Sequence, residues 1–266
     1  MRALFFVVLA GCGAATPPPA SSPRTERTLT GGGLSLFFRV IDGGAPAFVL
    51  EAGGGADSAS WGTFPIDLAK ATGRRVIAYD RAGFGKSPFP AKPFAIADEL
   101  AALHADLHEL GADRIVPVAA SYGALIAVAY TKTYPDQIAG LVFVDPMNAD
   151  FVEAVGLERV MTTVPKISAL KSDLERAVAR MVEGFPDLIA SLHGVRWPAN
   201  LPVVIVSAAT PPFPAADLQA AWRASHVTLA ATPGASRVLA TKSDHDITET
   251  EPEVVVAAAQ RVLARP

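Results

Sequence analysis

The chain has 266 residues, half of them hydrophobic, which is enough for one domain with a sizeable core. Its 23 basic and 26 acidic residues give a formal net charge of -3. No basic excess favours nucleic acid as a partner, and no run of like charge marks a binding tail.

The amino-terminal residues 1–11 are predicted to be an export signal. Arg2 supplies a positive charge, and the apolar run Ala3–Ala10 is too short to cross a bilayer. Leu9-Ala10-Gly11-Cys12 resembles a bacterial lipoprotein lipobox. That resemblance implies a lipid anchor at Cys12 and a place in the cell envelope, attached to a membrane. The alternative is an ordinary cleaved signal that happens to contain a cysteine.

Residues 12–30 are rich in Pro, Ala, Ser and Thr, and we predict that they form a flexible tether. From residue 31 to 266, short β-like runs alternate with longer helical ones. This alternation predicts an α/β fold with a mostly parallel central sheet flanked by helices. The expected strands are Leu34–Val40, Ala47–Glu51, Arg75–Tyr79, Ile115–Ala120, Gly140–Val144, Pro202–Ser207 and Ser236–Ala240, and the expected helices are Asp98–Leu110, Tyr122–Thr133 and Glu253–Leu263.

The span between the strands that end near Asp145 and begin near Pro202 is longer than one crossover helix requires. Helical segments are expected around Phe151–Met161 and Ser168–Val182. We therefore predict that residues 147–198 form a helical lid over the carboxyl edge of the sheet.

Ser121 is the predicted nucleophile. The run Ala119-Ala120-Ser121-Tyr122-Gly123 lies between an apolar strand and an apolar helix, which is the context of a Gly-x-Ser-x-Gly nucleophile elbow. Ala119 replaces the first glycine with the smallest available side chain. The alternative is a packing contact between small residues.

A serine hydroxyl needs a base, and nucleophile elbows of this kind take the order Ser, acid, His along the chain. Of five histidines, His245 lies in a polar loop after the last predicted strand. It is the predicted base; an ordinary loop histidine is the alternative. His104 and His108 have a spacing that could hold a metal, but no third ligand is evident, and no metal is predicted.

The acid is less determined. No carboxylate follows the strand Pro202–Ser207 until Asp217, which is expected on a helix, whereas Asp145 ends a central strand directly. Because a residue at the carboxyl end of a central strand points toward the site, we prefer Asp145 and keep Asp217 as the alternative. Asp244 and Asp246 flank His245, but adjacency in sequence does not direct a carboxylate at its ring.

Backbone N–H groups are the expected oxyanion donors. One should come from Tyr122, directly after the nucleophile, and the other from Gly54 in the loop after an early strand. A simple Gly-rich turn or a phosphate loop is the alternative for residues 51–55, although no Gly-Lys-Ser/Thr follows.

Taken together, these stretches resemble the α/β-hydrolase superfamily, in its serine-nucleophile branch, from about Leu29 to Arg265. The resemblance rests on residues 50–54, 79–87, 121–124 and 141–146 and on the loop around His245, in that order. It implies the fold and the triad chemistry without specifying a substrate.

We therefore expect a serine hydrolase, and most simply a carboxylic ester hydrolase that acts on a small or medium apolar molecule. Ser121 would form an acyl-enzyme with His245 as base, and no cofactor would be needed. A low-turnover sensor or binding protein that keeps the same residues is the main alternative. An amidase, a lactonase and a perhydrolase are the enzymatic ones.

Overall fold

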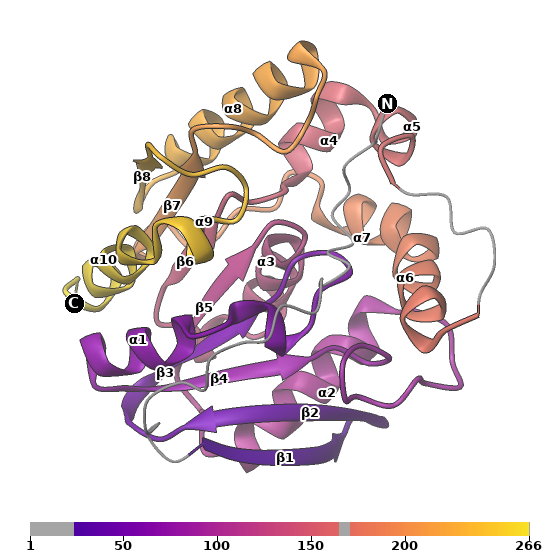
Figure 1. Cartoon of the computed structure of the whole chain (residues 1–266), viewed down its shortest axis with the longest axis vertical. Helices are drawn as coiled ribbons and strands as arrows, with labels where there is room; N and C mark the ends of the chain where they lie inside the picture. The colour runs from indigo at the N-terminus through magenta and orange to yellow at the C-terminus, as the bar shows by residue number, and fades with distance from the viewer. Residues whose placement is uncertain (1–23, 165–170, 266) are drawn as a thin grey trace.

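A twisted sheet of eight strands runs through the centre of the protein, in the order β1-β2-β4-β3-β5-β6-β7-β8 (Figure 1). The computed structural model describes residues 24–164 and 171–265. Its strands are β1 (Arg24–Gly31), β2 (Leu34–Ile41), β3 (Gly44–Glu51), β4 (Arg74–Asp80), β5 (Ile115–Ala120), β6 (Leu141–Val144), β7 (Val203–Ala208) and β8 (Ala235–Ala240).

Most neighbouring strands are parallel. β1 pairs antiparallel with β2, and β2 with β4, whereas β4, β3, β5, β6, β7 and β8 form a continuous parallel set. The carboxyl ends of β3, β5, β6 and β7 therefore meet at one edge, where the loops that follow them can bring side chains together.

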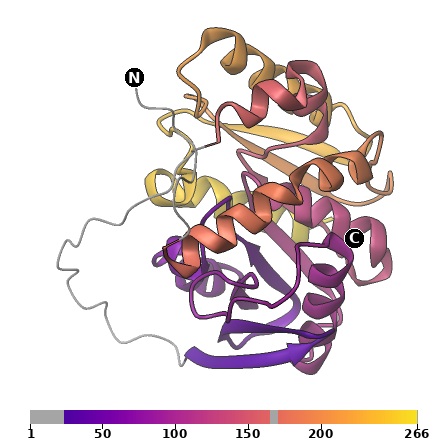
Figure 2. The same ribbon diagram turned by 90° about the vertical axis from the view of Figure 1, so that its right-hand side faces the viewer.

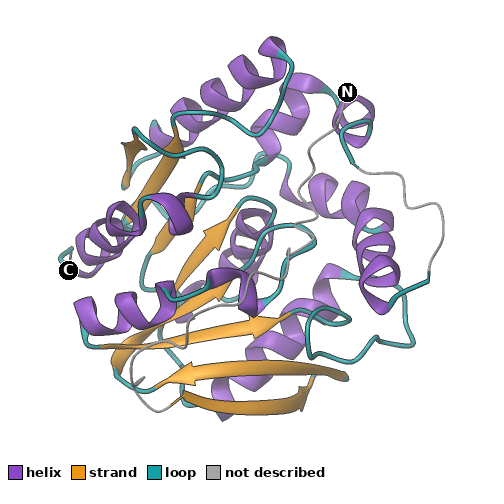
Figure 3. Ribbon diagram, in the orientation of Figure 1, coloured by secondary structure: helices purple, strands orange, loops and turns teal. Residues whose placement is uncertain are grey.

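Helices cover both faces of the sheet, as Figures 2 and 3 show. One face carries α2 (Ile96–Glu109), α3 (Gly123–Thr133) and α8 (Ala216–Ala230), whose apolar residues share one core cluster. The other carries α1 (Phe64–Thr72) and α10 (Pro252–Leu263), which belong to the second cluster. The short segments are η1 (Ser58–Trp61), η2 (Pro135–Gln137) and α9 (Ile247–Thr250). The predicted fold, a mostly parallel sheet between helical layers, is confirmed.

The strand β1 corrects the predicted tether. Residues 24–30 lie in this strand and pair with β2 across the turn at Gly32 and Gly33, so the folded domain begins before residue 31. Composition suggested a tether because the side chains of β1 are mostly exposed and polar. An edge strand needs no apolar face of its own when backbone hydrogen bonds join it to a buried neighbour. Residues 1–23, which include the predicted signal and Cys12, lie outside the described part.

A helical insert connects β6 to β7 and contains α4 (Ala149–Val155), α5 (Leu157–Met161), α6 (Asp173–Glu183) and α7 (Phe185–Leu192). The helix expected over 151–161 divides at Gly156, which has φ 90°. The start of the second expected helix, at residue 168, falls in residues 165–170, outside the described part of the chain. The helix α6 begins at Asp173, where Ser172 and Glu175 form a capping box. In the described residues no helix is long and apolar enough to cross a membrane.

The insert is tied to the core by a buried ion pair. Arg180 of α6 lies 2.6 Å from a carboxylate oxygen of Glu99 in α2, and both side chains are buried. Arg180 also donates to the backbone carbonyls of Lys92 and Pro93 in the loop before α2. These contacts fix α6 beside the segment that joins β4 to α2.

Candidate active site

Ser121 lies in a sharp turn between β5 and α3, as the elbow pattern predicts. Its φ of 50° falls in the left-handed region, which is unusual for a residue with a side chain. The turn needs a glycine at position 123, because a Cβ there would lie 2.4 Å from the backbone oxygen of Glu51. Ala119, by contrast, is fully buried in β5 with its methyl group accommodated.

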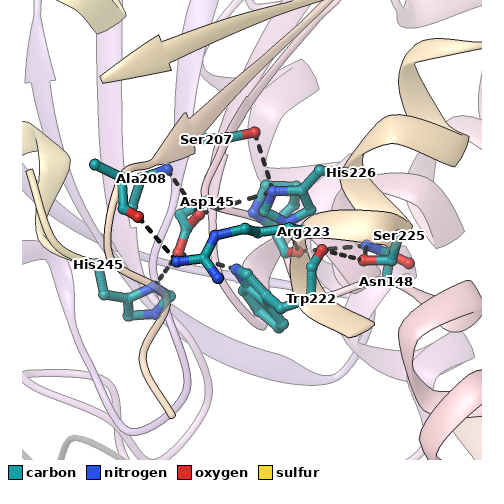
Figure 4. Close-up of polar contacts among 11 residues, drawn as sticks. Asp145, Asn148, Ser207, Ala208, Trp222, Arg223, Ser225, His226 and His245 are labelled. Carbon is teal, nitrogen blue, oxygen red and sulfur yellow. Dashed lines mark hydrogen bonds and ion pairs between the residues drawn. The ribbon is translucent and has the colours of Figure 1, made fainter. Parts of the chain in front are cut away.

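Asp145 follows β6 directly and contacts His245 (Figure 4). Its Oδ2 lies 2.7 Å from Nδ1 of the His245 ring. Asp145 is fully buried and has a φ of 41°, so it is a second residue with a side chain in the left-handed region. The Met147 N–H, just beyond it, donates to the Ser121 carbonyl over 3.0 Å, which joins the two turns.

The Asp145 carboxylate accepts two further hydrogen bonds. The backbone N–H of Ala208, at the end of β7, donates to Oδ1 over 2.9 Å, and the Trp222 indole N–H donates to Oδ2 over 3.1 Å. Burial by itself would raise the pKa of Asp145. The hydrogen bond from His245, the electrostatic effect of that ring and the Ala208 N–H outweigh burial and lower the pKa of Asp145 below its usual value, so the carboxylate stays ionised.

His226 of α8 lies behind Asp145. Its Nε2 is 2.9 Å from the Pro146 carbonyl, which can only accept, so this nitrogen carries the proton. Nδ1 then accepts from the Ser207 hydroxyl over 3.0 Å. Burial lowers the pKa of His226 although the Asp145 charge opposes this, and the ring is neutral.

The other candidate acids lie elsewhere. Asp217 is exposed on α8 and lies 3.6 Å from Arg159. Asp244 accepts from the backbone of Asp246 in its own loop. Of the carboxylates that the sequence offered, Asp145 is the one hydrogen-bonded to the His245 ring.

The predicted oxyanion loop approaches the elbow. A Cβ at Gly54 would lie 3.5 Å from that of Tyr122, and one at Gly53 would lie 3.6 Å from that of Ser121. Within the described residues, the N–H groups of Gly54 and Tyr122 have no hydrogen-bond acceptor, so both can serve a ligand.

Arg81 holds this loop in place. Its guanidinium donates to the carbonyls of Ala52 and Gly53, each over 2.6 Å, and lies 2.7 Å from the Glu51 carboxylate. Burial would lower the pKa of Arg81, but the Glu51 charge raises it above its usual value. Arg81 thus orients the backbone around Gly54.

These groups open onto one cavity of about 430 Å³, which is lined by Ser121, His245 and Gly54. Apolar and aromatic side chains form most of its remaining wall: Trp61, Phe84, Met147, Leu174, Phe213, Trp222 and Ile247. The carboxylates among its described lining residues are Asp57, Asp246 and Glu249. Such a cavity suits a small, mostly apolar ligand.

Trp222 and His226 are the site residues that the sequence did not reveal. Both residues lie in α8. The spacing of four residues between Trp222 and His226 indicates that both lie on one helical face. It does not indicate that this face contacts Asp145.

Comparison with known proteins agrees with this architecture. A family model described as alpha/beta hydrolase fold matches residues 46–201. The chain is 36% identical over 107 residues to the lipase LipV of Mycobacterium tuberculosis, covering 40% of this chain and 38% of that protein. It is 25% identical over 155 residues to a 2-hydroxy-6-oxo-2,4-heptadienoate hydrolase of Pseudomonas putida, covering 56% and 54%. These matches span little more than half of the relatives' length at most.

Among solved structures, the chain is similar to a thermophilic esterase from Thermogutta terrifontis. The TM-score is 0.64 at 20% sequence identity, over 90% of this chain and 98% of the other. At that identity, the similarity shows the shared fold alone.

Proposed function

The chain belongs to the α/β-hydrolase fold family, and we propose that it is a serine hydrolase that cleaves carboxylic esters through an acyl-enzyme. The observation that carries this proposal is the hydrogen bond between His245 and the buried, ionised Asp145, beside a serine in a strained elbow that lines the same cavity. A histidine that is held by a buried carboxylate and shares a cavity with the serine can act as the base that makes the hydroxyl nucleophilic.

In the proposed reaction, the Ser121 oxygen bonds to the carbonyl carbon of the ester while His245 takes the hydroxyl proton at Nε2. Asp145 stabilises the imidazolium through its bond to Nδ1. The N–H groups of Gly54 and Tyr122 hold the negative charge on the carbonyl oxygen.

The bond from the carbonyl carbon to the leaving oxygen then breaks, and His245 returns the proton to the alcohol. Water attacks the acyl-enzyme by the same route and releases the acid and free Ser121.

The walls of the cavity favour an ester without a free carboxylate. The described lining residues carry the acids Asp57, Asp246 and Glu249 and neither lysine nor arginine. The Pseudomonas putida relative is named for 2-hydroxy-6-oxo-2,4-heptadienoate, which is a carboxylate. An ester with a neutral, apolar acyl group suits this chain better. Leu174 of α6 lines the cavity, which supports a role for the insert as a lid.

The proposal is tested with a fluorophosphonate probe and a panel of p-nitrophenyl esters. The parent protein should be labelled at Ser121 and turn over steadily, and Ser121→Ala should abolish labelling and lower turnover by several orders of magnitude. One slow acylation without steady turnover would support the sensor instead. Equal labelling of parent and variant would exclude Ser121 as the nucleophile.

Export with a lipid anchor at Cys12 is proposed from the sequence of residues 9–12 alone. The parent protein should incorporate a fatty-acid analogue in a bacterial host, and Cys12→Ser should not. Absence of label on the parent would leave a plain exported chain.

A further inference from the structure

Asp145, the proposed triad acid at the end of β6, is held by the neighbouring strand and by a helix. Its partners outside the triad come from the end of β7, where Ala208 donates a backbone N–H, and from α8, where Trp222 donates its indole N–H. The β7 end carries no carboxylate of its own, so it acts as a donor to the acid on the neighbouring strand.

The α8 contacts converge on the residues around Asp145. Trp222 bonds the carboxylate, and His226, one helical turn later, bonds the carbonyl of Pro146, the next residue in the chain. Ser225, on the same stretch, accepts from the Asn148 side chain over 2.9 Å. One face of α8 thus fixes the left-handed backbone at Asp145 and the carboxylate that projects from it (Figure 4).

The Trp222 ring is itself held firmly. Only 1% of its surface is exposed, and it packs edge-on against Phe151 and Phe213 at centroid distances of 5.0 and 5.3 Å. The ring also lines the catalytic cavity and lies 6.0 Å from the His245 ring. Its N–H is a donor of fixed direction.

We propose that Trp222 is a positioning residue of the triad, whose indole N–H holds the Asp145 carboxylate against His245 and takes up part of its negative charge. Asp145 Oδ2 accepts from both Trp222 and His245, so the two donors share one oxygen. Removing the indole donor leaves more negative charge on the Asp145 carboxylate, which stabilises the His245 imidazolium. It also removes one of the three hydrogen bonds that fix the orientation of the carboxylate. This inference rests on the proposed triad.

Other groups around the pair are unchanged by a substitution at Trp222. The titratable and charged side chains that face Asp145 and His245, or act on their neighbours, are His226, Arg237, Asp244, Asp246 and Glu249. A change confined to Trp222→Phe is therefore assigned to the lost donor.

The test compares Trp222→Phe with Trp197→Phe. Trp197 is also buried and packs against Phe143, but its indole nitrogen has no partner among the described residues, so its replacement removes a similar volume without a donor contact. We expect Trp222→Phe to lower kcat/KM by about tenfold, mainly in kcat, and to shift the acid limb of the pH profile upward by about half a pH unit. Trp197→Phe should do neither.

A measurement on the unaltered protein removes the dependence on turnover and on the folding of a variant. In an NMR titration, the Trp222 indole proton should shift with the same midpoint as the His245 ring proton, while the Trp197 indole proton stays constant. The inference would be overturned if the Trp222 indole proton, like that of Trp197, did not shift as His245 titrates. It would also be overturned if the Trp222→Phe and Trp197→Phe variants had the same pH profile. Absent turnover together with a coupled titration would count against the proposed function only.

Discussion

Replacing Asp145 with asparagine tests the geometry of the site most directly. The two carboxylate oxygens of Asp145 face three donors, from His245, Trp222 and Ala208. An amide keeps one acceptor oxygen. Its oxygen can satisfy His245 and Trp222, but its NH2 then faces the Ala208 N–H, and no negative charge remains to stabilise the imidazolium.

The expected loss is large because both effects act on the base. An amide in place of a triad carboxylate costs about three to four orders of magnitude in kcat. This corresponds to about 4 to 5.5 kcal/mol of transition-state stabilisation. The measurement is kcat/KM for a p-nitrophenyl ester that the parent hydrolyses, with circular dichroism to show that the Asp145→Asn variant is folded.

Asp217→Asn is the matched control, because Asp217 is an exposed carboxylate on α8 that lies near Arg159 and not near His245. Its activity should stay close to that of the parent. A large loss in Asp217→Asn with a small loss in Asp145→Asn would refute the assignment. Small losses in both would mean that Ser121 and His245 work largely without an acid.

Three further predictions concern stability and the elbow. Asp106 is a buried carboxyl whose oxygens have no hydrogen-bond partner among the described side chains, and burial, followed by the Glu109 charge, raises its pKa from 3.8 to about 6. The folded state therefore loses stability as pH rises through that interval. In denaturant titrations, Asp106→Asn should raise the free energy of unfolding at pH 7.5 by up to about 3 kcal/mol and flatten its pH dependence. Gly123→Ala would place a methyl group 2.4 Å from the Glu51 carbonyl, and esterase activity should fall together with the melting temperature. Glu99→Gln leaves the buried Arg180 without its counter-ion, and thermal unfolding should show that the free energy of unfolding falls by about 3 to 5 kcal/mol. A decrease below about 1 kcal/mol would contradict the role given to this ion pair.

The amino-acid sequence by itself determined the sharp turn at Ser121 and the parallel sheet. The run before Ser121 is apolar throughout because β5 is covered on both faces, and the small residues around the serine permit its left-handed turn. Local patterns of this kind are readable because the constraint lies within a few neighbouring residues. The place of His245 was predicted in the same way, because the histidine lies in a polar loop directly after the last strand.

The edge strand β1 shows where local composition misleads. Its Thr and Arg side chains have no apolar periodicity, and the strand forms because β2 offers its backbone groups for pairing. A hydrogen-bonded ladder depends on a partner elsewhere in the chain, so composition alone placed these residues in a tether.

The tertiary structure alone decided which carboxylate meets His245. Asp145 and Asp217 were both open from sequence order, since a carboxylate far from the histidine along the chain can reach its ring only if the sheet and helices bring it there. The structure places Asp145 against the ring and directs α8 so that Trp222 and His226 face it, while Asp217, on the same helix, points to solvent. The helical period fixes which residues share a face, but the packing of α8 on β7 and β8 decides what that face touches.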